Sequence, residues 1–193
     1  MEVGVLALQG DFHAHEEALR RLGATTLAVR TAEELAASAA LVIPGGESSS
    51  IHRLMEAEQL GERVAERITQ GMPVLATCAG VIILARVVEP SQKSLALLDV
   101  DIVRNAYGRQ IASTVAMVDL DPVFGEPQQM TGVFIRAPRV TRVGSGVSPL
   151  GRLGDDVVLM REQNILAATF HPELCEDLRV HDMFLGMVGG RDD

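Results

Sequence analysis

Residues 74–80 read Val-Leu-Ala-Thr-Cys-Ala-Gly, so a short apolar run leads directly into one cysteine and then into small residues. The run Val74–Thr77 is typical of a buried strand, and residues 79–86 have the pattern of a helix. A strand that turns sharply into a helix at a reactive residue is the geometry of a nucleophile elbow. We therefore expect a strand–turn–helix unit centred on Cys78.

The chain before this unit alternates the same two kinds of segment. Apolar runs predict three further strands, at residues 3–9, 25–30 and 40–44. Helical periodicity predicts helices at 12–22 and 50–70, the second broken near Gly61, and a capping box at 31–34 predicts a short helix between them. Strands that alternate with helices form a parallel sheet covered on both faces, and ligands bind beyond the carboxyl ends of its strands.

The second half of the chain has a different pattern, with short β-like segments separated by turn residues. Six such segments are expected, at residues 100–103, 111–118, 132–135, 140–143, 157–161 and 165–170, and a last helix is expected at 176–188. The chain thus predicts a three-layer α/β fold, with a mostly parallel central sheet, flanking helices and an added antiparallel section in its second half. No repeat or linker divides it, so residues 1–193 are expected to form a single domain.

The composition excludes several classes of partner. The formal net charge of −9 argues against nucleic acid, because surfaces that bind polyanions carry an excess of basic residues. The longest strongly apolar run, Val81–Leu84, is far shorter than the roughly 20 residues that span a membrane, and residues 1–4 do not begin a signal peptide. Two cysteines do not make a disulfide framework in a chain of this length, which favours a reducing compartment. We expect a cytoplasmic protein.

Cys78 is the first candidate for chemistry. At a helix N-terminus the helix dipole favours the thiolate, which is the nucleophilic form of a cysteine. The backbone N–H of Ala79 would then point toward an oxyanion formed on the attacked carbonyl group. Taken alone, the same residues also fit an inert cysteine in the core.

The segment Phe-His-Pro-Glu at residues 170–173 is the second candidate. On an extended chain, residues i and i+2 point to the same side, so Glu173 would hold one nitrogen of His171 while the other nitrogen faces a thiol. This is the order of nucleophile, base and orienting acid in a catalytic triad. The segment alone also fits a loop histidine followed by a solvated glutamate.

The turn Pro-Gly-Gly-Glu-Ser-Ser-Ser at residues 44–50 is the third candidate. Paired glycines allow positive φ, so Gly46 could turn its N–H toward a ligand and act as a second oxyanion donor. An ordinary turn with a serine helix cap is the alternative, and a phosphate-binding P-loop is excluded because its Gly-Lys-Ser/Thr ending is absent. All three candidates follow predicted strands, so a parallel sheet would bring them to one edge.

Together these motifs resemble the class I glutamine amidotransferases, which use a Cys-His-Glu triad, and within that class the glutaminase subunits of pyridoxal 5′-phosphate synthase. The matching segments appear in family order, at residues 4–10, 41–48, 77–80, 104–110, 132–138 and 170–174. The segments at 104–110 and 134–138 are specific to this subfamily. The resemblance implies a flavodoxin-like fold and the hydrolysis of L-glutamine to L-glutamate and ammonia.

The resemblance also implies a role for individual residues. Cys78 attacks the glutamine amide and forms a thioester, His171 moves the protons, and Glu173 orients His171. Gly46 and Ala79 are expected to form the oxyanion hole. Contacts with glutamine are expected at Gly46, Glu47, Ser48, Arg104, Ile135 and Arg136. An arginine suits the α-carboxylate of the substrate, and the sequence leaves open which of the two arginines binds it.

The resemblance further implies a partner, a synthase subunit in a hetero-oligomer that receives the ammonia and builds pyridoxal phosphate. No cofactor is expected in this chain, because that chemistry belongs to the partner, and no metal, because His13-x-His15 lacks an evident third ligand. The alternatives are a class I amidotransferase subunit serving another synthase, and a non-catalytic regulatory partner. The chain departs from the family at Ala76, where glycine is usual, and at Cys175, which we interpret as a bystander.

Overall fold

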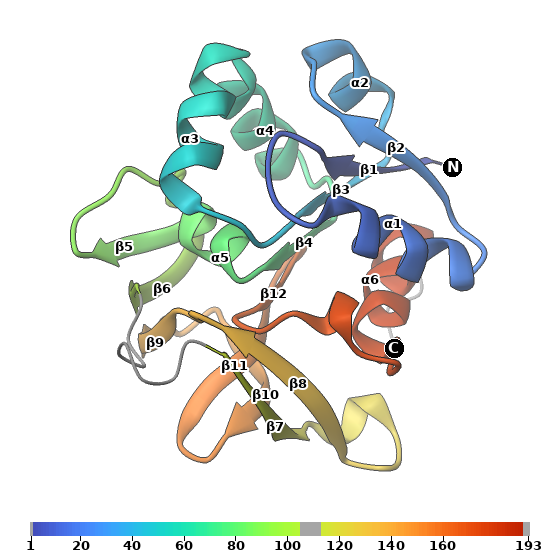
Figure 1. Cartoon of the computed structure of the whole chain (residues 1–193), viewed down its shortest axis with the longest axis vertical. Helices are drawn as coiled ribbons and strands as arrows, with labels where there is room; N and C mark the ends of the chain where they lie inside the picture. Colours follow the sequence, from blue (N-terminus) through green and yellow to red (C-terminus); the bar gives the residue numbers. More distant parts are fainter. Residues whose placement is uncertain (1, 105–112, 191–193) are drawn as a thin grey trace.

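The computed structural model of the 193-residue chain describes residues 2–104 and 113–190. Strands and helices alternate through the first half of the chain, and strands dominate the second half (Figure 1). Residues 105–110 of the motif at 104–110 and the first two residues of the strand predicted at 111–118 lie outside the described residues.

The described residues form a central sheet of nine strands with a parallel half and an antiparallel half. The parallel strands are β1 (Glu2–Leu6), β2 (Thr25–Val29), β3 (Ala40–Ile43), β4 (Val74–Thr77) and β12 (Ile165–Ala168). The antiparallel strands are β7 (Ser113–Leu120), β8 (Gln129–Ile135), β10 (Ser148–Leu153) and β11 (Asp156–Glu162). The order across the sheet is β2-β1-β3-β4-β12-β11-β10-β7-β8, so β8 is an edge strand.

Helices cover both faces of the parallel half, which gives three layers (Figure 1). One face packs against α1 (Phe12–Arg21) and α6 (Arg179–Gly189). The other packs against α2 (Ala32–Ala37), α3 (Ser48–Ala57), α4 (Leu60–Thr69) and α5 (Ala79–Leu84). A second sheet of β5 (Ala85–Glu89), β6 (Leu98–Val103) and β9 (Arg139–Val143) lies on that second side. In the described part of the chain, no helix combines the length and apolar character needed to cross a membrane.

Side chains along β3 alternate between the two faces of the sheet, and this alternation shows how the sequence forms the layers. Leu41 and Ile43 belong to the core on the α3–α5 side, whereas Ala40 and Val42 belong to the core under α1 and α6. All four side chains are fully buried. Strands covered on both faces must be apolar at every position, which is why this half of the sequence reads as continuous apolar runs.

Most predicted elements are present, and the capping box at the start of α2 is confirmed by its two reciprocal hydrogen bonds between Thr31 and Glu34. The helix predicted at 50–70 is two helices, because the break falls at Gln59, whose φ is +55°, and not at Gly61. The helix predicted at 79–86 is two residues too long, because α5 ends at Leu84 and an unpredicted strand, β5, follows directly.

Two other differences lie in the second half of the chain. Strand β10 was not predicted, since its proline and glycine resemble a turn, yet it pairs with β11 through two register shifts. The last helix begins at Arg179 instead of residue 176, because the 3₁₀ turn η2 (Pro172–Leu174) and a short connection precede it. A second 3₁₀ turn, η1 (Pro122–Phe124), links β7 to β8.

Candidate active site

Cys78 occupies the sharp turn between β4 and α5. Its backbone has φ +46° and ψ −102°, which lies outside the usual regions and costs about 1–3 kcal/mol. The N–H of Cys78 donates to the carbonyl oxygen of Ala168 at 2.8 Å. On the other side, α5 packs so close to β3 that a Cβ on Gly80 would lie 2.2 Å from the carbonyl oxygen of Ile43. The predicted strand–turn–helix unit is therefore present, with a thiol that is only 6% exposed at its apex.

His171 and Glu173 form a close pair. Nδ1 of His171 lies 2.7 Å from Oε1 of Glu173, and both side chains are buried. The expectation that an extended chain aligns them was wrong, because Glu173 lies in the 3₁₀ turn η2. Pro172 opens this turn with the φ that it requires, and the turn brings the carboxylate back to the imidazole ring.

The charged forms of these two groups support each other. Burial opposes a charge on His171, but its hydrogen bond with Cys78 and then the hydrogen bond and charge of Glu173 outweigh burial and raise its pKa to about 10. Burial also opposes the charge on Glu173, but its interactions with His15 and His171 outweigh burial and lower its pKa. His171 is thus placed to hold a proton taken from the thiol.

Gly45 shows how closely the turn after β3 approaches this pair. A Cβ built on Gly45 would lie 2.4 Å from Cε1 of His171 and 3.2 Å from Cβ of Cys78. Only a residue without a side chain fits there unless the ring or the turn moves. The structure therefore brings Cys78, His171 and Glu173 together beyond the carboxyl ends of β3, β4 and β12.

The segment that carries His171 lies along the free edge of β8. The N–H of His171 donates to the carbonyl oxygen of Val133 at 2.8 Å. Two strand positions back, the carbonyl oxygen of Thr131 accepts from Sγ of Cys175 at 3.1 Å. Burial raises the pKa of the Cys175 thiol, so this group is a hydrogen-bond donor that packs against the strand. These contacts do not bring Cys175 into the cavity beside Cys78.

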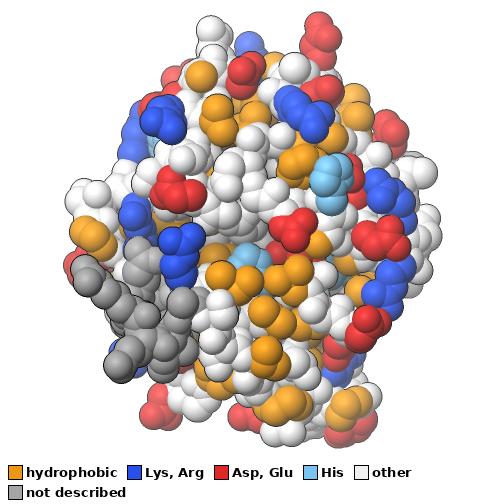
Figure 2. Space-filling view, viewed as in Figure 1, with side chains coloured by type: hydrophobic (Ala, Val, Ile, Leu, Met, Phe, Trp, Pro, Cys, Tyr) orange, Lys and Arg blue, Asp and Glu red, His pale blue; other side chains and the backbone are white. Residues whose placement is uncertain are grey.

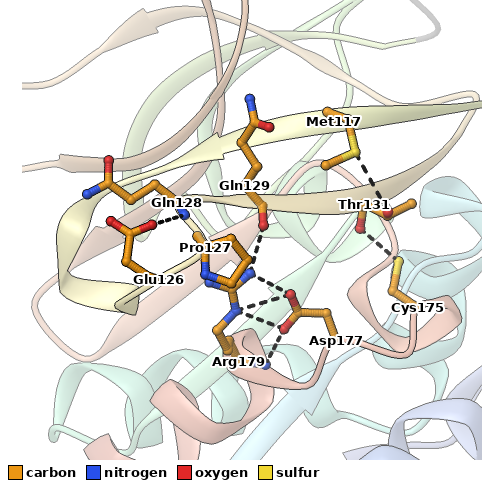
Figure 3. A network of polar contacts seen from close by, with 9 residues as sticks. All are labelled: Met117, Glu126, Pro127, Gln128, Gln129, Thr131, Cys175, Asp177 and Arg179. Carbon is orange, nitrogen blue, oxygen red and sulfur yellow. Dashed lines mark hydrogen bonds and ion pairs between the residues drawn. The ribbon is translucent and has the colours of Figure 1, made fainter.

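Arg179 extends the same attachment to the start of β8. Its guanidinium donates to the carbonyl oxygen of Pro127 at 2.6 Å and to that of Gln129 at 2.8 Å. Figure 3 shows the carboxylate of Asp177 beside the same guanidinium, and the shortest of their contacts is 2.6 Å. Because these are charge-assisted bonds to an otherwise open strand edge, they fix the position of the whole segment from 171 to 179.

The turn between β3 and α3 contains Gly46 and Glu47, and Ser48 is the first residue of α3. The carboxylate of Glu47 caps α3, accepting at 3.1 and 2.8 Å from the N–H groups of two serines in the first turn of that helix. Hydrogen bonds from these serines lower the pKa of Glu47 to about 2. Oε1 of Gln9 accepts from the N–H of Glu47 at 2.7 Å, and a Cβ on Gly46 would lie 2.4 Å from that oxygen. The helix cap is thus Glu47 and not a serine.

A cavity of about 230 Å³ opens over the thiol of Cys78 and the ring of His171. It is smaller than the pockets of about 300–1,000 Å³ that hold drug-sized ligands, so it suits a small metabolite. All six residues predicted to contact glutamine line it, namely Gly46, Glu47, Ser48, Arg104, Ile135 and Arg136. The predicted residues Ala79 and Glu173 are not among its lining residues, and both are buried.

Several residues of this region were not predicted from the sequence. Gln9 and Ile82 also line the cavity. Gln9 follows β1, which is parallel to its neighbour β3, so the rule about strand ends could have identified it. His15 lies 3.3 Å from Glu173. The HxH motif was considered only as a metal motif, but the helical spacing of His15, Ala18 and Leu19 could have placed His15 on the buried face of α1.

Comparisons with known proteins indicate one family. The model of the SNO glutamine amidotransferase family matches residues 5–189. Pyridoxal 5′-phosphate synthase subunit PdxT from Thermotoga sp. (strain RQ2) is 47% identical over 97% of this chain and 100% of its own length. The protein of the same name from Pelotomaculum thermopropionicum is 47% identical over 96% of this chain and 94% of its own.

Solved structures confirm the predicted fold class. A crystal structure described as a glutamine amidotransferase has a TM-score of 0.90 and 44% identity, and the match covers 97% of this chain and 98% of that chain. The crystal structure of a putative GMP synthase component from Thermoplasma acidophilum has a TM-score of 0.73 over 98% of this chain and 94% of its own. At 19% identity, the second likeness bears on the fold alone.

Proposed function

The chain belongs to the SNO glutamine amidotransferase family, and on this basis we propose that it is the glutaminase subunit of a pyridoxal 5′-phosphate synthase. It hydrolyses L-glutamine to L-glutamate and ammonia for vitamin B6 biosynthesis. The observation that carries this proposal is the convergence of Cys78 and His171 at a small cavity on the carboxyl edge of the parallel strands, with Glu173 bonded to His171 behind it.

Cys78 is the nucleophile of the proposed reaction. Its sulfur attacks the side-chain amide carbon of glutamine, and the negative charge develops on the amide oxygen. When the tetrahedral intermediate collapses, ammonia leaves and a glutamyl thioester remains on Cys78. The strained turn supports this role, because it places Cys78 at the head of α5 and in the lining of the cavity.

His171 transfers the protons and Glu173 orients it. His171 takes the thiol proton, gives it to the leaving ammonia, and then activates the water that hydrolyses the thioester. The 2.7 Å contact with Glu173 fixes the ring and supports its positive charge. The N–H groups of Gly46 and Ala79 are the proposed oxyanion donors, because one lies in the turn against Cys78 and the other at the N-terminus of α5.

Glutamine binding is assigned to the cavity walls. Arg104 and Arg136 supply positive charge for the α-carboxylate, and Ile135 packs against the side chain of the substrate. Because the carboxylate of Glu47 caps α3, the turn from Gly46 to Ser48 contributes through its backbone and through Ser48.

The proposed partner is a synthase subunit that receives the ammonia in a hetero-oligomer. The named relatives are subunits of such a synthase. Exposed large hydrophobic side chains occur on β7, β8 and η2, at Val115, Met117, Ile135 and Leu174. Figure 2 shows hydrophobic side chains gathered over the lower centre of the face that Figure 1 presents. Ile135 also lines the cavity, so an apolar partner surface there would cover the mouth of the site.

Two further statements belong to this proposal. The two cysteines of the chain are free thiols, which supports a reducing, cytoplasmic location. The described elements pack around one central sheet with a core on each face, which supports a single amidotransferase domain over residues 1–193.

A glutaminase assay with purified variants tests the function. Cys78→Ala should lower ammonia release by at least about 10³-fold while thermal unfolding stays unchanged, because the nucleophile is lost. Cys175→Ala is the matched control and should keep wild-type activity. Adding the synthase subunit should raise wild-type activity and leave Cys78→Ala inactive. Glutamine turnover by pure Cys78→Ala would exclude the nucleophile, and absence of both stimulation and complex formation would exclude the partner.

A further inference from the structure

A second histidine lies behind the carboxylate of Glu173. Oε1 of this carboxylate bonds to His171, and Oε2 faces Nε2 of His15 at 3.3 Å. The side chains of His15 and Glu173 are both fully buried, so water does not reach the contact. Oε2 has no hydrogen-bond partner among the described residues, so its contact with His15 is electrostatic. A buried carboxylate oxygen without a partner is costly unless a nearby N–H dipole stabilises it.

A third histidine determines which nitrogen of His15 carries the proton. Nδ1 of His15 lies 3.0 Å from Nε2 of His181, and both rings are fully buried. If Nε2 of His181 donates, then Nδ1 of His15 is the acceptor and its Nε2 carries the hydrogen, on the side of Thr77 and Glu173. The opposite assignment would place a nitrogen lone pair against the carboxylate oxygen and leave the N–H at Nδ1 of His181 buried without an acceptor. The first arrangement is therefore favoured.

This arrangement requires the imidazole rings of His15 and His181 to be neutral, and burial favours the neutral form of both. Burial is the main cause that lowers the pKa of His15, although the charge of Glu173 opposes it. Burial, and then the neighbouring His15, lowers the pKa of His181 to about 3. Both imidazoles are thus uncharged at neutral pH, and each has one donor and one acceptor nitrogen.

His15 also contacts the residue that supports the oxyanion turn. Its Nε2 lies 3.1 Å from Oγ1 of Thr77, and the same oxygen accepts from the N–H of Gly45 at 3.1 Å. Thr77 immediately precedes Cys78, and Gly45 immediately precedes the proposed oxyanion donor. One buried imidazole therefore lies next to the orienting carboxylate and to the hydroxyl that holds the Gly45 turn.

We propose that His15 is a positioning residue of the glutaminase, because its Nε2–H is 3.3 Å from the otherwise unpartnered Oε2 of Glu173 and so stabilises the carboxylate that orients His171. His181 holds His15 in the tautomer that makes this contact. The inference rests on the proposed function, and it adds a second histidine on the far side of the Cys78–His171–Glu173 set. His15 does not line the cavity, so it acts on the reaction through Glu173 and not through glutamine.

Steady-state kinetics of glutamine hydrolysis, with the synthase subunit present, test this role. His15→Leu removes the donor, and kcat should fall about 10- to 100-fold, whereas KM for glutamine should change less than about threefold. His15→Gln places an amide N–H at a similar reach and should restore kcat to within about fivefold of wild type. His13→Leu is the matched control on the same helix, since the His13 side chain is 78% exposed, and should have wild-type kcat.

A double-mutant cycle separates positioning from a merely structural role. If His15 acts through Glu173, then adding His15→Leu to Glu173→Ala should lower kcat by less than about twofold further. If His15→Leu does not fold, the apolar pair His15→Leu/His181→Leu takes its place in the same comparisons, because replacing both partners leaves no buried group unpaired.

The results of these experiments either support or overturn the role of His15. A non-additive cycle with rescue by glutamine at position 15 supports the proposal. A full loss in both backgrounds, or wild-type kcat in folded His15→Leu, would overturn it while the glutaminase assignment stands. A wild-type protein that hydrolyses no glutamine with the synthase subunit would overturn the proposed function, and this inference with it.

Discussion

The backbone N–H of His171 donates to the carbonyl oxygen of Val133 at 2.8 Å, so the segment after β12 lies along the edge of β8. Thr131 and Gln129, at alternate positions of the same strand, accept from Cys175 and Arg179. An edge strand has a row of unsatisfied carbonyl groups, and here a segment carrying two of the proposed triad residues satisfies them. The placement of the histidine therefore depends on contacts as distant as Arg179.

Arg179→Met removes the two hydrogen bonds that fix the far end of this segment. We expect the free energy of unfolding to fall by about 1–3 kcal/mol, because charge-assisted bonds to backbone carbonyls are lost and Asp177 loses its partner. kcat should fall by a few-fold only, because the bond from His171 to Val133 remains. Urea denaturation and glutaminase kinetics measure the two effects. The control is Arg21→Met, whose exposed pair with Glu176 is worth about 0–1 kcal/mol. Equal stability of the two variants would contradict the prediction.

Gly45→Ala should separate activity from stability. The new Cβ would lie 2.4 Å from Cε1 of His171, so the ring or the turn must shift. A displacement of about 1 Å in a catalytic group costs on the order of 10²-fold in rate, and we expect a loss of that size in kcat. Gly61→Ala is the control, because nothing lies within 4 Å of its added methyl and alanine favours a helix by about 0.5–1 kcal/mol. Undiminished kcat in Gly45→Ala would show that the turn does not hold His171 in its working position.

Glu173→Ala should leave weak activity, unlike Cys78→Ala. The base remains when its orienting carboxylate is removed, so the loss should be smaller than that caused by removing the nucleophile. Comparing kcat of the two variants in one assay gives the ranking. Wild-type turnover by Glu173→Ala would remove Glu173 from the triad.

Acid should destabilise the protein through its buried neutral histidines. The pKa of His181 is lowered to about 3 by burial and then by its neighbour His15, with Glu173 opposing, whereas in the unfolded chain it is about 6.5. The unfolded state therefore binds more protons between these values, so stability is complete above about pH 6.5 and falls as the pH drops toward 3. His181→Leu removes one titrating group. The slope of the free energy of unfolding against pH should therefore fall by about 1.4 kcal/mol per pH unit near pH 5. Urea denaturation at several pH values measures both slopes, and parallel curves would contradict the prediction.

The elbow and the parallel sheet could be predicted because their signals are local. Residues 74–80 contain the strand, the nucleophile and the small residues of the elbow within seven positions. The rule that ligands bind beyond parallel strand ends then placed Gly46 and His171 on the same edge from the sequence alone. What the rule needs is only the order of strands and helices, which apolar runs reveal directly.

The missing parts depend on contacts between distant segments. Strand β10 contains Pro149 and Gly151, which locally resemble a turn, and it becomes a strand through its pairing with β11 and β7. His15 and His181 are 166 positions apart, so no local pattern could show that they share a buried hydrogen bond behind Glu173. The sequence indicated Glu47 as a glutamine contact in the turn, but it did not show that both of its carboxylate oxygens cap α3.

The thioester on Cys78 is the most direct test of the mechanism. Glutamine turnover with the synthase subunit present can be stopped with acid, and the intact protein and its peptides can be weighed by mass spectrometry. We predict that the wild-type chain gains the mass of one glutamyl group on the peptide that contains Cys78, and that Cys78→Ala gains none. Ammonia release by the wild type with the glutamyl group on another residue, or the same adduct on Cys78→Ala, would contradict it.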